Sequence, residues 1–123
     1  VCFFRADVLH DELPQGYDIM MCSLFMHHLE EPEVVELLYK MKAAAGRMVL
    51  VSDLVRCRAG YVMAVTASRM LCRSRVAHVD APQSVRAAFT MEEFEALADE
   101  AGMDGAHIEW HWPRRLLLTW RRP

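Results

Sequence analysis

Two apolar runs on either side of one amphipathic segment constrain this chain more than any other feature. Residues 17–22 are apolar on both faces after the first two positions, and residues 48–51 form a second such run. Between them, Pro32 sits among glutamates where a helix would begin, and Gly46 supplies the stop. Strands that are apolar on both faces are typical of parallel sheets covered by helices. The order strand, helix, strand with short connections therefore predicts a right-handed parallel crossover and an α/β fold.

The flanking segments add further predicted elements. Residues 1–5 read as a buried strand that ends near Asp7, and residues 60–73 read as a helix. We expect residues 75–88 to be irregular, because Ala81-Pro82 is a helix breaker. Thr90 and Glu93 form a capping-box pattern at the start of a further helix, which ends at Gly102. Residues 106–112 and 116–121 read as strands that are too close for a helical crossover, which predicts a closing antiparallel pair.

Length and composition indicate one globular domain. The chain has 123 residues, of which 54% are hydrophobic and 25% charged. It begins at Val1 instead of Met and runs at once into apolar sequence, which suggests a fragment or a processed chain. The four cysteines are scattered and none has CxxC spacing, so we expect reduced thiols and a cytoplasmic protein.

Arginines gather between residues 56 and 89, where six arginines accompany the single acid Asp80. Such a patch can meet an anionic ligand, a membrane surface or nucleic acid, although a solvated helix face is the more favoured interpretation. The longest apolar stretch there is about half as long as a membrane-spanning helix needs to be. We therefore expect no stable membrane insertion, while peripheral contact stays open.

The ordered motifs resemble the second half of the class I S-adenosylmethionine (SAM)-dependent methyltransferases, of the type that acts on small molecules. The matching segments are Arg5-Ala6-Asp7-Val8 followed by Leu13-Pro14, Tyr17-Asp18-Ile19 followed by Ser23-Leu24-Phe25-Met26-His27-His28-Leu29, the stretch from Met41-Lys42 to Val51, and Thr90-Met91-Glu92-Glu93-Phe94 through Ala101-Gly102.

The resemblance implies an α/β, Rossmann-like methyltransferase fold with a mainly parallel sheet and a terminal antiparallel hairpin. It also implies an incomplete fold, because the sequence contains no GxGxG and lacks the first two strands and the glycine-rich loop. Residues 1–123 would then be the C-terminal part of one methyltransferase domain, with residues 54–89 in the substrate-lid region. The loop's backbone amides normally hold the methionine part of the cofactor, so we expect the isolated chain to bind SAM poorly.

The same resemblance assigns cofactor-binding residues. Asp7 would contact the adenine amino group, and the backbone amide of Val8 would contact a ring nitrogen. Ser23 and Leu24 would line the boundary between cofactor and substrate. Ligands of open α/β sheets sit beyond the carboxyl ends of the strands, so Asp7, Ser23 and Asp53 are expected along one rim.

His27 is the candidate catalytic base, because an imidazole titrates near neutrality and can take a proton from an acceptor. In plant-type O-methyltransferases the base follows the same strand at the position of His27, but here His28 stands where that family has an aspartate. A structural role for both histidines stays open. Four residues are candidates for substrate binding: His28, Asp53, Tyr61 and Arg86. No metal site is expected, since adjacent histidines do not easily share one ion.

The resemblance implies methyl transfer from SAM to a small-molecule acceptor, with oxygen or carbon as the methylated atom. Two alternatives stay open: half of a nicotinamide-dependent dehydrogenase, or a non-catalytic Rossmann-like protein that binds or scaffolds. The closing antiparallel pair argues against the dehydrogenase. Nucleic-acid methylation is disfavoured, because Ser23-Leu24-Phe25-Met26 replaces the Asn/Asp-Pro-Pro-Tyr type motif.

Overall fold

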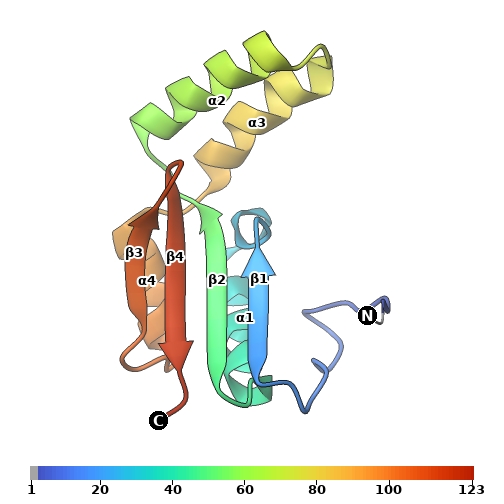
Figure 1. The fold of residues 1–123 in the computed structure, drawn as a ribbon, viewed down its shortest axis with the longest axis vertical. Coiled ribbons are helices and arrows are strands. Elements are labelled where there is room, and N and C mark those ends of the chain that lie inside the picture. The colour runs from blue at the N-terminus through green and yellow to red at the C-terminus, as the bar shows by residue number, and fades with distance from the viewer. Residues whose placement is uncertain (1–2) are drawn as a thin grey trace.

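A mixed four-stranded sheet lies at the centre of the fold. The structure is a computed structural model that describes residues 3–123. The strands lie in the order β1-β2-β4-β3, with bounds Ile19–Ser23 (β1), Met48–Leu54 (β2), His107–His111 (β3) and Arg115–Arg121 (β4). β1 and β2 are parallel, while β4 runs antiparallel to both β2 and β3 (Figure 1). The predicted crossover and closing antiparallel pair are confirmed. The sheet is mixed instead of mainly parallel, because β4 inserts beside β2 and only one of the three pairings is parallel.

Two helices cover one face of this sheet. α1 (Glu31–Ala44) makes the crossover from β1 to β2, and α4 (Met91–Glu100) precedes β3; both lie behind the sheet in Figure 1. The predicted capping box of α4 is present: Thr90 Oγ1 accepts from the Glu93 amide at 3.2 Å, and Glu93 accepts from the Thr90 amide at 2.9 Å. Each satisfied amide stabilises the first turn, so α4 begins where the sequence indicates.

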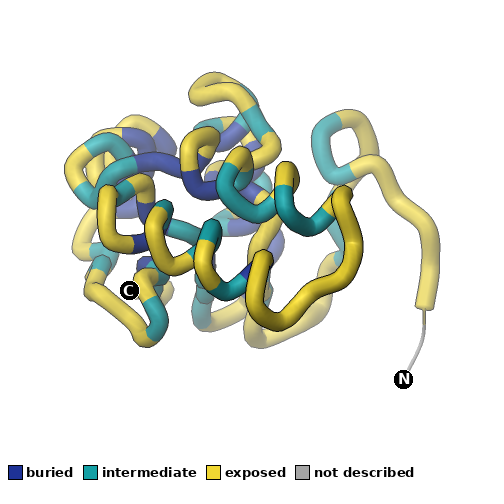
Figure 2. Tube along the Cα trace, turned by 90° about the horizontal axis from the view of Figure 1, so that it is seen from above, coloured by how far each residue is buried: buried dark blue, intermediate teal, exposed yellow. Residues whose placement is uncertain are grey.

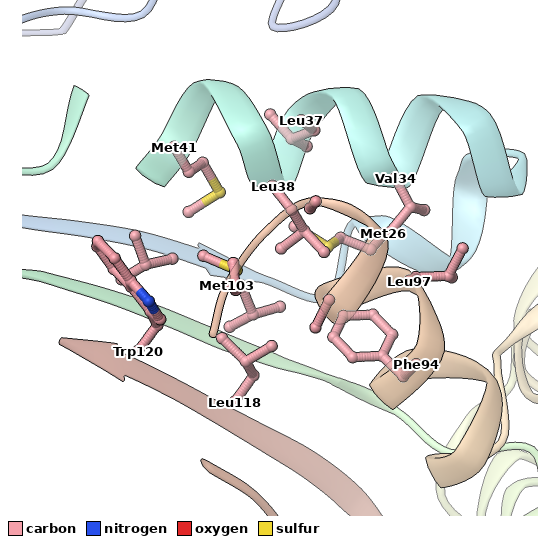
Figure 3. Packing of buried hydrophobic residues seen from close by; sticks show 14 of the residues in the cluster. Met26, Val34, Leu37, Leu38, Met41, Phe94, Leu97, Met103, Leu118 and Trp120 are labelled. Atoms are coloured by element: carbon pink, nitrogen blue, oxygen red, sulfur yellow. The ribbon is translucent and has the colours of Figure 1, made fainter. Parts of the chain in front are cut away.

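The core fills the space between these helices and the sheet (Figure 3). Side chains alternate along the two central strands, so that Val49 and Val51 of β2 and Leu116 and Leu118 of β4 point into the core. Phe94 of α4 is fully buried among them. The opposite face carries partly exposed side chains, and none of the helices described for residues 3–123 covers it (Figure 1). The core is therefore one-sided.

A helical hairpin extends beyond the C-terminal end of β2. It consists of α2 (Arg58–Leu71) and α3 (Arg75–Ala87), and its two ends are tied by a parallel bridge between Val55 and Phe89 (Figure 1). The prediction that residues 75–88 are irregular is wrong, because α3 continues through Pro82. Proline removes one helical hydrogen bond. Packing of α3 along α2 is a non-local contact that stabilises the helix in spite of this loss.

Within the described residues 3–5, no strand is present where the sequence predicts one. Phe3–Arg5 have no regular secondary structure, and the first two residues of the predicted strand lie outside the described residues. Phe3 is 93% exposed, and the segment runs apart from the sheet and body of the molecule (Figure 2). A strand needs a hydrogen-bonded neighbour, and none of the described strands lies beside these residues. No helix within residues 3–123 is both long enough and apolar enough to cross a membrane.

Candidate active site

The carboxyl ends of the two parallel strands meet at one edge of the sheet, below the helical hairpin. Ser23 at the end of β1 pairs with Ser52 of β2, so Asp53 lies one residue further along β2. After Ser23 the chain turns at Leu24, whose φ is 52°, and enters the short 3-10 helix η1 (Met26–His28). The strand register thus delivers the start of η1 directly onto Asp53. The shared edge predicted for Ser23 and Asp53 is present.

Asp53 is 2% exposed and both of its carboxylate oxygens are occupied. Its Oδ2 accepts hydrogen bonds from the backbone amides of Phe25, Met26 and His27 at 3.2, 2.6 and 3.3 Å. Its Oδ1 accepts from the Leu54 amide at 2.7 Å and contacts Nδ1 of His27 at 2.6 Å. The carboxylate therefore fixes the loop that carries His27, and it orients the imidazole at the same time.

The imidazole of His27 is held in one defined orientation. A carboxylate can only accept, so Nδ1 of His27 carries the proton and donates it to Asp53. In the neutral ring Nε2 then carries the lone pair. Nε2 has no hydrogen-bond partner within residues 3–123, and no fully buried side-chain nitrogen or oxygen there lacks one. Nε2 must therefore face open space, although His27 as a whole is only 6% exposed.

His27 lines a cavity of about 340 Å³, which we call the histidine cavity, and we assign the open side of Nε2 to it. η1, the end of β2, both helices of the hairpin and the β3–β4 turn contribute to it. The exposed His28 also lines the cavity, and its ring centroid lies 4.1 Å from that of His27. The lining residues are Leu24, His27, His28, Leu54, Gly60, Met63, Ala64, Asp80, Ala81, Ser84, Val85, Arg114 and Arg115. Its walls are thus mainly apolar, with two imidazoles at one side.

Two of the four predicted cofactor residues lie at a second cavity of about 340 Å³ along the free edge of β1, the edge groove. Val8 and Ser23 line the edge groove, whereas Leu24 lines the histidine cavity. The edge groove is lined by Val8, Leu13, Ile19, Met20, Met21, Cys22, Ser23, Phe25, Leu37 and Met41. Ser23 and Leu24 are adjacent in the chain, so neighbouring residues of the loop after β1 line the two cavities.

Asp7 lies in an exposed turn and does not line either cavity. It does not end a strand, because residues 3–7 form none, so the predicted rim contains Ser23 and Asp53 without Asp7. Its carboxylate accepts from the Leu9 amide at 3.1 Å and contacts the His10 ring at 3.0 Å. These hydrogen bonds, led by that of Leu9, hold the pKa of Asp7 below its ordinary value.

The four predicted substrate-binding residues divide among three places. His28 lines the histidine cavity, and Asp53 lies buried beneath it with no free oxygen. Tyr61 and Arg86 do not reach that cavity. They line a separate one of about 390 Å³ at the base of the hairpin. Within residues 3–123, no group of three or more histidine, cysteine or acidic side chains is arranged to hold a metal ion.

The sequence did not reveal two features of the site. The first is the contact between His27 and Asp53, which are 26 residues apart. Its only sequence signal was that both residues follow strands expected to be parallel. The second is the contribution of Asp80, Ser84 and Arg114 to the cavity wall, which depends on the path of the hairpin and the β3–β4 turn. A larger cavity, about 690 Å³, lies at the opposite end of β1 and β2, away from His27 and Asp53.

The fold is like that of the corresponding part of solved SAM-dependent methyltransferases. The chain superimposes on PigF, solved with S-adenosylhomocysteine (SAH), with a TM-score of 0.66 and 14% identity, covering 96% of this chain and 38% of PigF. For SibL, a SAM-dependent methyltransferase in its apo form, the TM-score is 0.66 at 17% identity. This match covers 98% of this chain and 35% of SibL. The chain also superimposes on an O-methyltransferase family 2 protein from Planctomyces limnophilus DSM 3776 in complex with apigenin. The TM-score is 0.58 and the sequence identity 13%, and the match covers 96% of this chain and 33% of that protein.

The chain therefore spans about a third of the length of these proteins. No protein-family model matches it, and no curated protein matches it. At these identities the likeness concerns the fold.

Proposed function

We propose that this chain carries the acceptor side of a SAM-dependent methyltransferase that methylates a hydroxyl group of a small molecule, with His27 as the general base. The observation that carries the proposal is the buried pair of His27 and Asp53, joined at 2.6 Å, with Nε2 of His27 open to the histidine cavity. An unprotonated nitrogen that faces a cavity, with its other nitrogen fixed by a carboxylate, is the arrangement that general-base catalysis needs.

The chemistry asks little more of the protein than positioning and one proton transfer. SAM, when bound, supplies a methyl group on an already activated sulfonium. An acceptor hydroxyl within hydrogen-bond reach of Nε2 would lose its proton to His27 as its oxygen attacks. Asp53 would then stabilise the resulting imidazolium, because its Oδ1 already accepts from Nδ1. Asp53 is in this scheme a positioning residue, and the need for a base favours oxygen over carbon as the methylated atom.

The histidine cavity favours a flat, mostly apolar acceptor. Its walls include Leu24, Leu54 and Met63, and its volume of about 340 Å³ lies at the lower end of small-molecule sites. The solved neighbour from Planctomyces limnophilus holds apigenin, a phenolic molecule. We therefore propose phenols of one to three rings as acceptors. Ser84 and Asp80 of α3 are available to bind a second polar group of the acceptor.

The edge groove is the proposed place for the adenosine part of the cofactor. Its apolar lining, which includes Val8 and Met20, fits a flat ring. Its lining residue Ser23 is followed in the chain by Leu24, which lines the histidine cavity. The residues present do not supply a glycine-rich loop for the methionine part, because the sequence contains no GxGxG. We therefore propose that residues 1–123 hold SAM weakly by themselves, as the incomplete-fold interpretation also requires.

Methyl transfer from radiolabelled SAM to apigenin and to a one-ring catechol tests the proposal. The chain is assayed alone and joined to the part of PigF that this chain does not cover. His27→Ala should lower turnover of the active form by about a hundredfold or more, whereas His28→Ala should lower it much less. A loss of under about threefold for His27→Ala would leave the pair structural. SAH binding without any transfer would favour the non-catalytic alternative.

A further inference from the structure

We propose a second ligand site, distinct from the histidine cavity, at the base of the α2–α3 hairpin, where three arginines surround an apolar cavity. The ligand is an oxyanion, a phosphate or a carboxylate, attached to a flat apolar group. The cavity has a volume of about 390 Å³, and its rim carries Arg56, Arg58 and Arg86. This proposal goes beyond the methyl-transfer function and does not depend on it.

The charge of this region is not balanced by neighbouring acids. Residues 56–88 contain six arginines and the single acid Asp80. Within residues 3–123 only Arg56 of these six has a carboxylate within ion-pair distance, that of Glu93. Arg58 and Arg86 therefore face the same cavity with no protein anion beside them. Guanidinium groups bind phosphate and carboxylate through paired hydrogen bonds, so an anion is the natural complement.

Arg86 is already held in place to receive such an anion. Its guanidinium lies over the ring of Tyr61, 4.8 Å from the centroid, and donates to Tyr61 Oη at 3.1 Å. A stacked guanidinium loses less freedom on binding than a free one. Its remaining N–H groups stay available, because Tyr61 Oη is the only hydrogen-bond acceptor that it contacts within residues 3–123. The fixed orientation distinguishes Arg86 from the arginines of a merely solvated face.

Arg58 brings a second positive group to the same point. It is the first residue of α2, where the helix end is itself positive, so a cation there is unfavourable without an anion. The Cys57 side chain accepts from the Gly60 amide at 3.3 Å, and the Arg58 amide has no acceptor within the described residues. This free amide supports the arginines but would not define a site without them.

The floor of the cavity defines the rest of the ligand. Val62 and Val85 line it together with the Tyr61 ring, and Val62 is 59% exposed. An inorganic anion would leave these apolar side chains in water, whereas an aromatic body would cover them. Val85 also lines the histidine cavity, so a ligand bound between α2 and α3 would contact the back of that cavity's wall.

Titration of the ¹⁵N-labelled chain with phenyl phosphate, benzoate and inorganic phosphate, followed by amide chemical shifts, tests the proposal. Saturable shifts are expected at residues 56–62 and 85–86. Arg86→Gln should weaken phenyl phosphate binding at least tenfold, because it removes a charge-assisted contact. Arg75→Gln changes an exposed arginine of α3 outside this cavity and should alter binding less than twofold. Phenyl phosphate and benzoate distinguish a phosphate from a carboxylate headgroup.

Three results would overturn the proposal. Shifts that do not saturate, or equal effects of Arg86→Gln and Arg75→Gln, would show a solvated basic face without a site. If inorganic phosphate binds as tightly as phenyl phosphate, the apolar group contributes nothing to binding, and the proposed ligand is wrong. Spectra of each variant without ligand verify that it is folded. His27→Ala should leave this binding unchanged, so the outcome is separate from that of the methyl-transfer assay.

Discussion

Replacing Asp53 with asparagine removes one buried charge while keeping the size of the side chain. The wild-type carboxylate accepts five hydrogen bonds, three at Oδ2 from the amides of residues 25–27 and two at Oδ1 from Leu54 and His27. An amide group has one oxygen and one donor nitrogen, so one of these two sets must lose its acceptor. If the oxygen stays with the loop amides, the new NH₂ group faces the Leu54 amide, donor against donor.

The expected destabilisation follows from these contacts. A buried donor left without an acceptor costs about 1–3 kcal/mol, and the three loop bonds weaken because the acceptor is no longer charged. His27 can recover its contact by moving its proton from Nδ1 to Nε2. We therefore expect Asp53→Asn to lower the free energy of unfolding by about 2–4 kcal/mol. With a urea m-value of about 2 kcal/mol/M, the midpoint should fall by about 1–2 M.

Urea unfolding followed by tryptophan fluorescence measures this change, since Trp120 is buried in the core. Asp99→Asn is the matched control: Asp99 is exposed on α4 and its side chain makes no hydrogen bond or ion pair within residues 3–123. It should shift the free energy by less than about 0.5 kcal/mol. A midpoint for Asp53→Asn within 0.3 M of the control, roughly 0.6 kcal/mol at the same m-value, would refute the assignment of these hydrogen bonds.

Three further outcomes are expected. Thr90→Ala should cost about 1 kcal/mol in urea unfolding because it removes the α4 cap, whereas Thr66→Ala within α2 should be close to neutral; equal effects would argue against the capping box. Burial raises the pKa of the Cys22 thiol to about 11. At pH 8, iodoacetamide should therefore modify Cys22 roughly a hundredfold more slowly than the exposed Cys72. Peptide mass spectrometry measures the two rates, and comparable rates would contradict this prediction. Because the pKa of Asp7 is lowered, its hydrogen bonds stabilise the turn above about pH 4, and this stabilisation is lost as the pH falls through the pKa of the folded state. If NMR shows that the Asp7 carboxyl titrates with its ordinary pKa, these hydrogen bonds are excluded.

Local patterns predicted the elements whose stability is itself local. The capping box at Thr90 and the short connection between the last two strands each settle their structure within a few residues, and both predictions are confirmed. The two wrong predictions concern non-local contacts. α3 continues through Pro82 because α2 packs along it, and Phe3–Arg5 form no strand because none of the described strands lies beside them. Sequence periodicity carries no information about either neighbour.

The candidate site shows the same division. His27 and Asp53 each follow a strand that the sequence predicts, and the placement of both at one edge follows from the parallel crossover. Their direct contact depends on strand register, because only the pairing of Ser23 with Ser52 brings η1 onto the Asp53 carboxylate. A shift of one residue along β2 would turn Asp53 to the other face of the sheet. Tyr61 and Arg86 line a different cavity, because their neighbours Gly60 and Val85, and not they themselves, line the histidine cavity.

The two members of the pair allow a structural role and a catalytic role to be separated. Asp53 accepts five hydrogen bonds, whereas the His27 side chain makes one within residues 3–123, so a purely structural pair predicts a larger stability loss for Asp53→Asn than for loss of the imidazole hydrogen bond. For a structural pair, each substitution should lower turnover only as far as it lowers the free energy of unfolding. A catalytic pair predicts that Asp53→Asn lowers turnover about as much as His27→Ala, because a proton moved to Nε2 blocks the base while leaving the ring in place. Turnover measured against pH in the folded variants decides between them: if Asp53→Asn retains the wild-type profile and rate, His27 does not act through Asp53.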